Sequence, residues 1–162
     1  MHEVKIVEWR SPLSTCEPIQ SDFVSIAEAS PRGILGLRGD LTNSDFLFEV
    51  KGILGFEIPD KPNSTVVGEI ASALWLGPDE WLIITSPHDQ FKIEESLRRN
   101  LVSSGASIVD LTESRAVIKI SGNKVRDVLA KGCPLDLHPR MFMPGVCKQS
   151  VIAKASIILH NI

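Results

Sequence analysis

The stretch over residues 73–85, which reads ALWLGPDEWLIIT, constrains the fold of this chain more than any other. Two short apolar runs, each with one tryptophan, flank the sequence Gly77-Pro78-Asp79-Glu80. Proline at the second position of a four-residue turn supplies the φ of roughly −65° that type I and type II turns require. The stretch therefore predicts a β-hairpin.

Neither strand of this hairpin alternates between apolar and polar residues. Leu74 and Trp75, for example, point to opposite faces, and both are large and apolar. A strand with one face in water shows a polar residue at every second position. Both faces must therefore be covered, either by the chain itself or by a partner. The residues that we expect at such an interface are Trp75, Pro78, Asp79 and Trp81.

The other segments predict an α+β fold, with small mixed or antiparallel sheets and helices packed on them. The clearest helix begins after the hairpin. Ser86 suits the N-cap, Pro87 the first helical position and Asp89 the third position after the cap. We expect this helix to end at Gly105.

Two further helices are predicted from weaker signals. Thr42 followed by Asp45 resembles a capping box and predicts a helix start at Thr42, and Gly55 suits the position just past the helix end. Ser121 is predicted to cap a later helix that ends at Gly132. Single short strands are predicted over residues 4–9 and 150–159.

The order strand, glycine, helix, glycine, proline-containing loop occurs twice, over residues 34–59 and 117–134. This coarse repeat predicts two related halves, of which the second lacks a partner strand and a closing helix. An unpaired sheet edge would result, and three explanations stay open: the sequence is a shortened form, a partner covers the edge, or the repeat is imperfect. The predicted organisation is an N-terminal arm (1–31) and a single domain (32–162) with halves of about 32–105 and 106–162.

Composition excludes several classes of function. A net charge of −3 gives no electrostatic reason to expect nucleic acid or an anionic membrane as a partner. No apolar run approaches the roughly 20 residues of a membrane span, and the N-terminus is not a secretory signal. Three widely spaced cysteines favour reduced thiols in the cytoplasm over a disulfide scaffold.

Candidate chemical groups are few. Cys133, His138 and Cys147 form one Cys/His grouping, but a zinc site typically has paired close spacings, so a structural role is favoured. Asp136 and His138 are two residues apart in a proline-rich loop, where a hydrogen-bonding role is favoured over acid/base catalysis. No metal ligand, cofactor-binding residue or catalytic residue is assigned.

Two strand-to-helix turns, Gly39-Asp40 and Ser121-Gly122-Asn123, could present backbone amides to a phosphate. Neither contains the multi-glycine pattern of a dinucleotide or P-loop site, so ordinary turns are favoured. The adjacent carboxylates Asp79 and Glu80 are interpreted as solvated turn residues.

The sequence contains four longer blocks: GLRGD (36–40), ALWLGPDEWLI (73–83), IVDLTESRAVIKISG (108–122) and LAKGCPLDLHPRMFMPG (129–145). These blocks resemble the gamma subunit of heterotetrameric sarcosine oxidase and occur in that family's order. Family members continue past the position of Ile162 with another strand and a helix, so the resemblance implies an incomplete second half here.

This resemblance implies a fold similar to the folate-binding domains of aminomethyltransferases. The family's enzyme is an oxidoreductase acting on the CH–NH group of its donor: it oxidatively demethylates sarcosine to glycine and passes the one-carbon unit to tetrahydrofolate. Its alpha, beta and delta subunits are the implied partners. The alpha and beta subunits would hold the FAD, FMN, NAD and tetrahydrofolate, and the delta subunit would hold zinc. The family supplies no catalytic motif in the gamma subunit, so no functional residue is carried over.

Three functional hypotheses of different classes follow, of which the plainest is a stand-alone structural domain with no partner. The leading one is a non-catalytic subunit that supports assembly of a sarcosine oxidase complex. The alternative is an independent folate-binding or aminomethyl-transferring domain, which would need a carboxylate to hold the pterin. The candidate carboxylates are Glu80, Asp110 and Asp136.

Overall fold

The structure is a computed structural model that describes residues 10–162, and the strand predicted over residues 4–9 lies outside that range. The described residues form strands, three α-helices and two short 3-10 helices, Val102–Ser104 and Thr112–Ser114. The strands are β1 (Ile19–Gln20), β2 (Ser25–Glu28), β3 (Gly33–Arg38), β4 (Thr65–Val67), β5 (Ala71–Gly77), β6 (Glu80–Thr85), β7 (Ser107–Asp110), β8 (Ile118–Ser121), β9 (Cys147–Ile152) and β10 (Ala155–His160). The α-helices are α1 (Ser44–Leu54), α2 (Pro87–Asn100) and α3 (Val125–Leu129).

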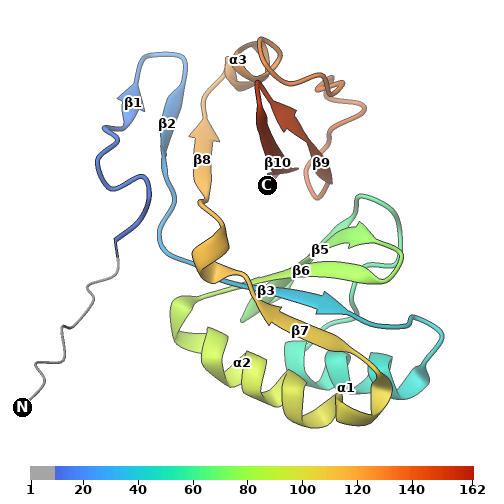
Figure 1. The fold of residues 1–162 in the computed structure, drawn as a ribbon. Coiled ribbons are helices and arrows are strands. Elements are labelled where there is room, and N and C mark those ends of the chain that lie inside the picture. Colours follow the sequence, from blue (N-terminus) through green and yellow to red (C-terminus); the bar gives the residue numbers. More distant parts are fainter. Residues whose placement is uncertain (1–9) are drawn as a thin grey trace, which may run out of the picture.

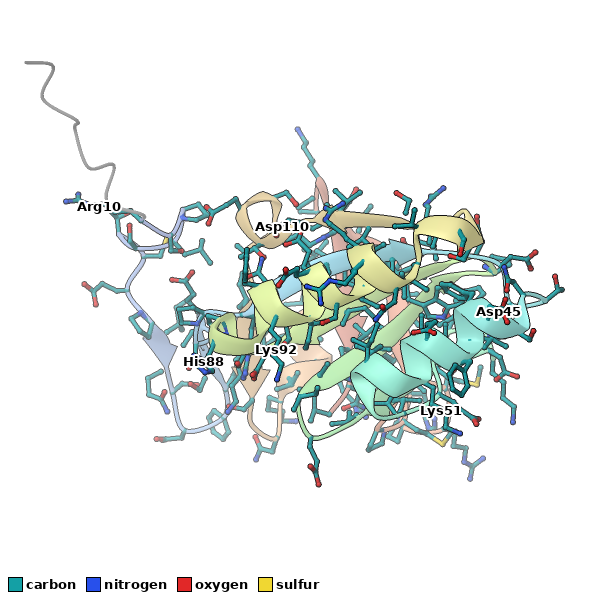
Figure 2. All side chains as sticks on the ribbon, turned by 90° about the horizontal axis from the view of Figure 1, so that it is seen from below. Arg10, Asp45, Lys51, His88, Lys92 and Asp110 are labelled. Atoms are coloured by element: carbon teal, nitrogen blue, oxygen red, sulfur yellow. The ribbon has the colours of Figure 1, made fainter. Side chains whose placement is uncertain are left out.

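The largest unit is a five-stranded antiparallel sheet in the order β4-β5-β6-β3-β7, with α1 and α2 on one face (Figure 1). Apart from the edge strand β4, its elements run along the chain as β3-α1-β5-β6-α2-β7, which is the strand and helix order of ferredoxin-like folds. Seen from below, α1 and α2 lie side by side across the sheet, α1 carrying Asp45 and Lys51 and α2 carrying His88 and Lys92 (Figure 2). The predicted α+β class is confirmed.

The predicted hairpin over residues 73–85 is confirmed as β5 and β6, in which Trp75 pairs with Trp81. The chain itself covers both faces. On the helix side, Trp81 joins a core of buried residues from the sheet and both helices. On the other side, Leu74 and Leu82 pack with Cys147 of β9. The apolar character of both faces therefore follows from a sheet that lies between two layers of the same chain.

The start of α2 agrees with the prediction, whereas its end comes before the predicted Gly105. The Ser86 hydroxyl accepts a hydrogen bond from the Asp89 amide at 3.1 Å, and Pro87 is the first helical residue. The helix itself ends at Asn100, and Val102–Ser104 adds one 3-10 turn before Gly105, which adopts a φ of +71°.

The predicted start of α1 at Thr42 is wrong. Asn43 is the N-cap, and its side-chain oxygen accepts hydrogen bonds from the Asp45 and Phe46 amides at 3.0 and 3.1 Å. The Thr42 hydroxyl instead donates to the Asp40 carboxylate at 2.7 Å. Gly55 ends the helix with a φ of +82°, as predicted.

The second half repeats the order of the first as β8-α3-β9-β10. Ser121 does not cap α3, since it is the last residue of β8 and the helix starts at Val125. The single strand predicted over residues 150–159 is also wrong. The chain turns at Ala153-Lys154, so that β9 and β10 form an antiparallel hairpin. The second half thus has the partner strand that the sequence reading lacked, and β10 bonds to no described strand other than β9.

The N-terminal segment contributes strands to the second half. β1 and β2 form a hairpin, and β2 pairs antiparallel with β8, so that Ile26 lies opposite Ile120. Figure 1 shows these three strands beside the β9–β10 hairpin and α3. The division into an arm and a domain at residue 32 stays a prediction, and within this segment residues 25–28 pair with residues 118–121.

Candidate functional site

The hairpin tip is the exposed part of the predicted interface. Pro78 and Asp79 are exposed and form the turn between β5 and β6. The backbone fixes this turn, because the Gly39 amide donates to the Asp79 carbonyl at 3.1 Å. An ion pair between Arg38 and Glu80, 2.8 Å apart, joins the ends of β3 and β6. The hairpin tip is therefore held in position against the end of β3.

The two tryptophans of the predicted interface have different surroundings. Trp81 is 0% exposed, and its indole Nε1 donates to the Pro59 carbonyl at 2.8 Å. Its ring lies 6.0 Å from the ring of Phe46, measured between centroids. Trp75 is half-buried, and its Nε1 is buried without a hydrogen-bond partner among the described residues. The interface stays a prediction, and only Pro78, Asp79 and part of Trp75 offer it surface.

Cys133 and His138 of the Cys/His grouping make contacts within the fold. Cys133 is buried, with its Sγ 3.7 Å from the Ser150 hydroxyl. His138 is exposed in a loop, where its backbone amide donates to the Asp136 carboxylate at 2.9 Å and its Nδ1 accepts from the Arg140 amide at 3.2 Å. The predicted loop role of Asp136 and His138 is confirmed. Within residues 10–162, no group of three or more His, Cys, Asp or Glu residues could hold a metal ion.

The three candidate pterin carboxylates lie apart. In the strand register, Glu80 lies opposite Arg38, and Asp110 lies opposite Leu35. Because these two partners are three residues apart in β3, the two acidic residues are separated by about 10 Å along the strand direction. Asp110 accepts a hydrogen bond from the Thr112 amide at 2.9 Å. Asp136 belongs to the exposed loop of the second half. No convergent carboxylate pocket is formed by these three groups, and the folate-binding alternative gains no support from them.

The two turns considered for phosphate binding make contacts with other groups of this chain. The Asp40 carboxylate accepts hydrogen bonds from the amide and the hydroxyl of Thr42, and these lower its pKa below the usual value. Gly122, in the other turn, lies against the backbone of Phe23. Both turns therefore have structural contacts, in agreement with the prediction of ordinary strand-to-helix turns.

A pair that the sequence reasoning missed lies across the β9–β10 hairpin. Cys147 and His160 are directly opposite each other in the strand register. The Cys147 Sγ is 3.3 Å from the Trp75 carbonyl, and burial raises the pKa of this thiol. Burial lowers the pKa of His160, whose Nε2 is buried without a hydrogen-bond partner in the described range. A protonated thiol beside a neutral imidazole is not an activated nucleophile, since thiolate is the reactive form.

The buried imidazole predicts a pH dependence of stability. Because folding lowers the pKa of His160, the unfolded chain binds a proton as the pH falls through about 6.5 while the folded chain resists it. The unfolded state then holds more protons than the folded state, so the free energy of unfolding decreases as the pH is lowered. Between pH 7.5 and 5.5 we expect the urea midpoint to fall less in His160→Leu than in the wild-type chain.

The matched control for this measurement is His138→Leu, at an exposed loop position. It should keep the wild-type pH dependence. Equal pH dependence of wild-type and His160→Leu proteins would contradict the assignment of this effect to His160.

No helix within the described residues has the length and hydropathy needed to cross a membrane.

Comparisons with known proteins agree on one family. A model described as "Sarcosine oxidase, gamma subunit family" matches residues 38–162. The gamma subunit of sarcosine oxidase from Corynebacterium sp. (strain P-1) is 35% identical over 91 residues, which is 56% of this chain and 44% of that protein. Its counterpart from Arthrobacter sp is 36% identical over 99 residues, which is 57% of this chain and 48% of that protein. This chain thus spans about half the length of the curated relatives it matches.

A solved structure is similar over a larger part of the chain. The structure is the heterotetrameric sarcosine oxidase from Corynebacterium sp. U-96 in complex with pyrrole 2-carboxylate. A chain of that assembly matches with a TM-score of 0.82 at 26% identity, covering 94% of this chain and 81% of the other. Since the family model covers well over half of the sequence and the fold agrees, the chain belongs to the sarcosine oxidase gamma subunit family.

Proposed function

We propose that this chain is a non-catalytic gamma subunit of a heterotetrameric sarcosine oxidase, and that it supports assembly of the complex. The observation that carries the proposal is the structural match, because it extends over 94% of this chain and its counterpart comes from a heterotetrameric enzyme. The family match over residues 38–162 supports the same conclusion from the sequence.

In this proposal the chemistry takes place in the partner subunits. The complex would demethylate sarcosine oxidatively to glycine and pass the one-carbon unit to tetrahydrofolate, in the cytoplasm. The alpha, beta and delta subunits would be the partners of this chain, and the alpha and beta subunits would hold the FAD, FMN, NAD and tetrahydrofolate. This chain would contribute a folded surface to the assembly.

The chemistry of the described residues supports a non-catalytic role. The buried thiol of Cys147 has a raised pKa and the neighbouring His160 a lowered one, so neither carries a charge near neutral pH. Asp136 and His138 hold a loop. Glu80 takes part in an ion pair that closes the end of the main sheet.

Co-expression of this chain with the other three subunits from the same source tests the proposal. With an affinity tag on the alpha subunit, we expect this chain to co-purify and to elute with the complex in size-exclusion chromatography. Omitting it should lower the yield and the thermal midpoint of the complex. Elution of this chain alone, together with a stable and fully active complex that lacks it, would contradict the proposal.

A further inference from the structure

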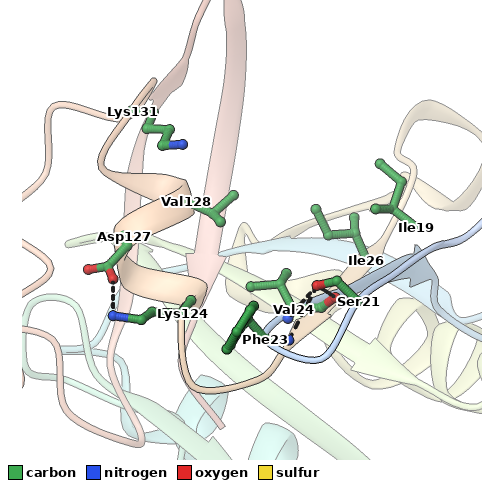
Figure 3. Close-up of a pocket in the computed structure, with 9 residues that line it drawn as sticks. All are labelled: Ile19, Ser21, Phe23, Val24, Ile26, Lys124, Asp127, Val128 and Lys131. Carbon is green, nitrogen blue, oxygen red and sulfur yellow. Dashed lines mark hydrogen bonds and ion pairs between the residues drawn. The ribbon is translucent and has the colours of Figure 1, made fainter.

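A shallow apolar hollow lies between the β1–β2 hairpin and α3 (Figure 3). We call it the α3 hollow; its volume is about 500 Å3, and its apolar lining residues are Ile19, Phe23, Val24, Ile26 and Val128. Ile19 is 61% exposed and Phe23 is 58% exposed. Large apolar side chains that gather on a surface are typical of a site that contacts another molecule.

The walls of the hollow are fixed in place by hydrogen bonds. The Ser21 hydroxyl accepts from the amides of Phe23 and Val24, at 3.3 and 3.0 Å, and also donates to the Val24 carbonyl. The Phe23 carbonyl accepts from the Lys124 amide at 3.3 Å, which ties the hairpin to the start of α3. The hollow is therefore formed before any partner binds, which reduces the entropy lost on binding.

The charged side chains beside the hollow favour an acidic partner. Lys124, Asp127 and Lys131 line it, and Lys124 lies 3.0 Å from Asp127 in an ion pair. The Lys131 amide donates to the Val128 carbonyl, but the Lys131 side chain makes no hydrogen bond or ion pair within residues 10–162, so its ammonium group is available. Cations that remain after local pairing attract carboxylates and steer their approach.

The charge distribution along the chain points the same way. Residues 106–162, which include α3, contain eight Lys or Arg residues against four Asp or Glu. Residues 1–105 contain nine against sixteen. The α3 wall of the hollow thus belongs to the basic part of an otherwise acidic chain. Two more exposed phenylalanines, Phe48 and Phe91, belong to α1 and α2 in the acidic part, and each is 75% exposed.

We propose that the α3 hollow docks a segment of another subunit that carries a large apolar side chain flanked by carboxylates. The apolar side chain packs against Phe23, Ile19 and Val128, and a carboxylate approaches Lys131. The proposal rests on the proposed function, because it names the surface by which this chain joins its complex. Phe23 is expected to contribute most, since aromatic residues dominate binding where they become buried.

The test uses the complex co-expressed with a tagged alpha subunit, with the amount of this chain per complex as the readout. Phe23→Asp should reduce the retained chain at least tenfold, and Lys131→Glu should reduce it severalfold. The matched controls Phe48→Asp and Phe91→Asp introduce the same charge at exposed phenylalanines of the acidic part. They should leave retention unchanged. Circular dichroism of each isolated variant checks folding, and Ile19→Asp replaces Phe23→Asp if the latter unfolds.

The outcomes separate the two proposals. If the wild-type chain is not retained, the proposed function fails and this inference fails with it. If the wild-type chain and the folded hollow variants are retained equally, only this inference is overturned. The same holds if Phe48→Asp or Phe91→Asp causes the greater loss.

A cross-link identifies the chemistry of the occupant. With benzoylphenylalanine at position 19, illumination of the complex should join this chain to a peptide of another subunit that contains apolar and acidic residues. A cross-link to residues 1–9 of the same chain, or to a segment rich in Lys and Arg, would overturn the proposal.

Discussion

Replacement of Trp81 by alanine is expected to lower the free energy of unfolding by about 3–5 kcal/mol, the usual effect of removing a large buried aromatic side chain. Trp81 is 0% exposed and packs against Phe46 in the core beneath α1 and α2. Removal of the indole also leaves the Pro59 carbonyl without its 2.8 Å hydrogen bond. Since small domains are stable by about 5–15 kcal/mol, the variant should be close to unfolding. Urea denaturation followed by far-ultraviolet circular dichroism measures the change.

Two conservative variants separate the ring from its N–H group. Trp81→Phe keeps an aromatic ring but leaves the Pro59 carbonyl unpaired, at a cost of about 1–3 kcal/mol. Trp75→Phe removes a buried N–H group that has no partner among the described residues, so it should cost less than Trp81→Phe. Equal losses in the two phenylalanine variants would show that the hydrogen bond to Pro59 has no measurable effect.

Gly122→Ala is expected to detach the β1–β2 hairpin from β8. A Cβ atom at this position would lie 2.2 Å from the Phe23 carbonyl oxygen and 2.9 Å from its carbon, so two backbone segments would have to separate. The residue also adopts a φ of +121°, which is strained for any other residue by about 1–3 kcal/mol. Hydrogen exchange should show lost protection in β2 and β8, with β5 and β6 keeping theirs. The measurement is amide exchange followed by mass spectrometry.

The control for Gly122 is Gly55→Ala at the end of α1. Gly55 also has a positive φ, of +82°, but a Cβ there would meet nothing within 4 Å. This variant therefore reports backbone strain alone, about 1–2 kcal/mol. If Gly55→Ala destabilised the chain as much as Gly122→Ala and left β2 and β8 protected in both, the close contact with Phe23 would not be the cause.

The elements that could be predicted from the sequence are those whose signals are local. Pro78 marks the turn of the central hairpin, and Ser86 with Pro87 marks the start of α2. These residues act through their own backbone geometry, so a short window of sequence is enough. The predicted start of α1 was wrong by one residue, because two neighbouring residues have similar capping chemistry. Thr42 and Asn43 can both cap a helix, and Asp40 accepts the Thr42 hydroxyl, which leaves Asn43 as the cap.

The elements that could not be predicted depend on distant contacts or on an unusual turn. The strands of the N-terminal hairpin are short, and β2 is ordered by its pairing with β8. The β9–β10 turn contains Ala153 at a φ of +51°, a conformation that glycine or asparagine normally signals. Without that turn, the cross-strand pair of Cys147 and His160 could not be found. The α3 hollow could not be predicted either, because its two walls are distant in the sequence and meet through the contact between Phe23 and Lys124.

The pairing of Ile26 with Ile120 has a consequence for synthesis of the chain on the ribosome. Translation proceeds at about 5–20 residues per second, so roughly 5–20 s pass between these two residues. In that interval residues 33–110 can complete the five-stranded sheet, whereas β2 has only β1 beside it. Phe23 and its apolar neighbours remain available to chaperones throughout. The segment made early is thus among the last to reach its native place.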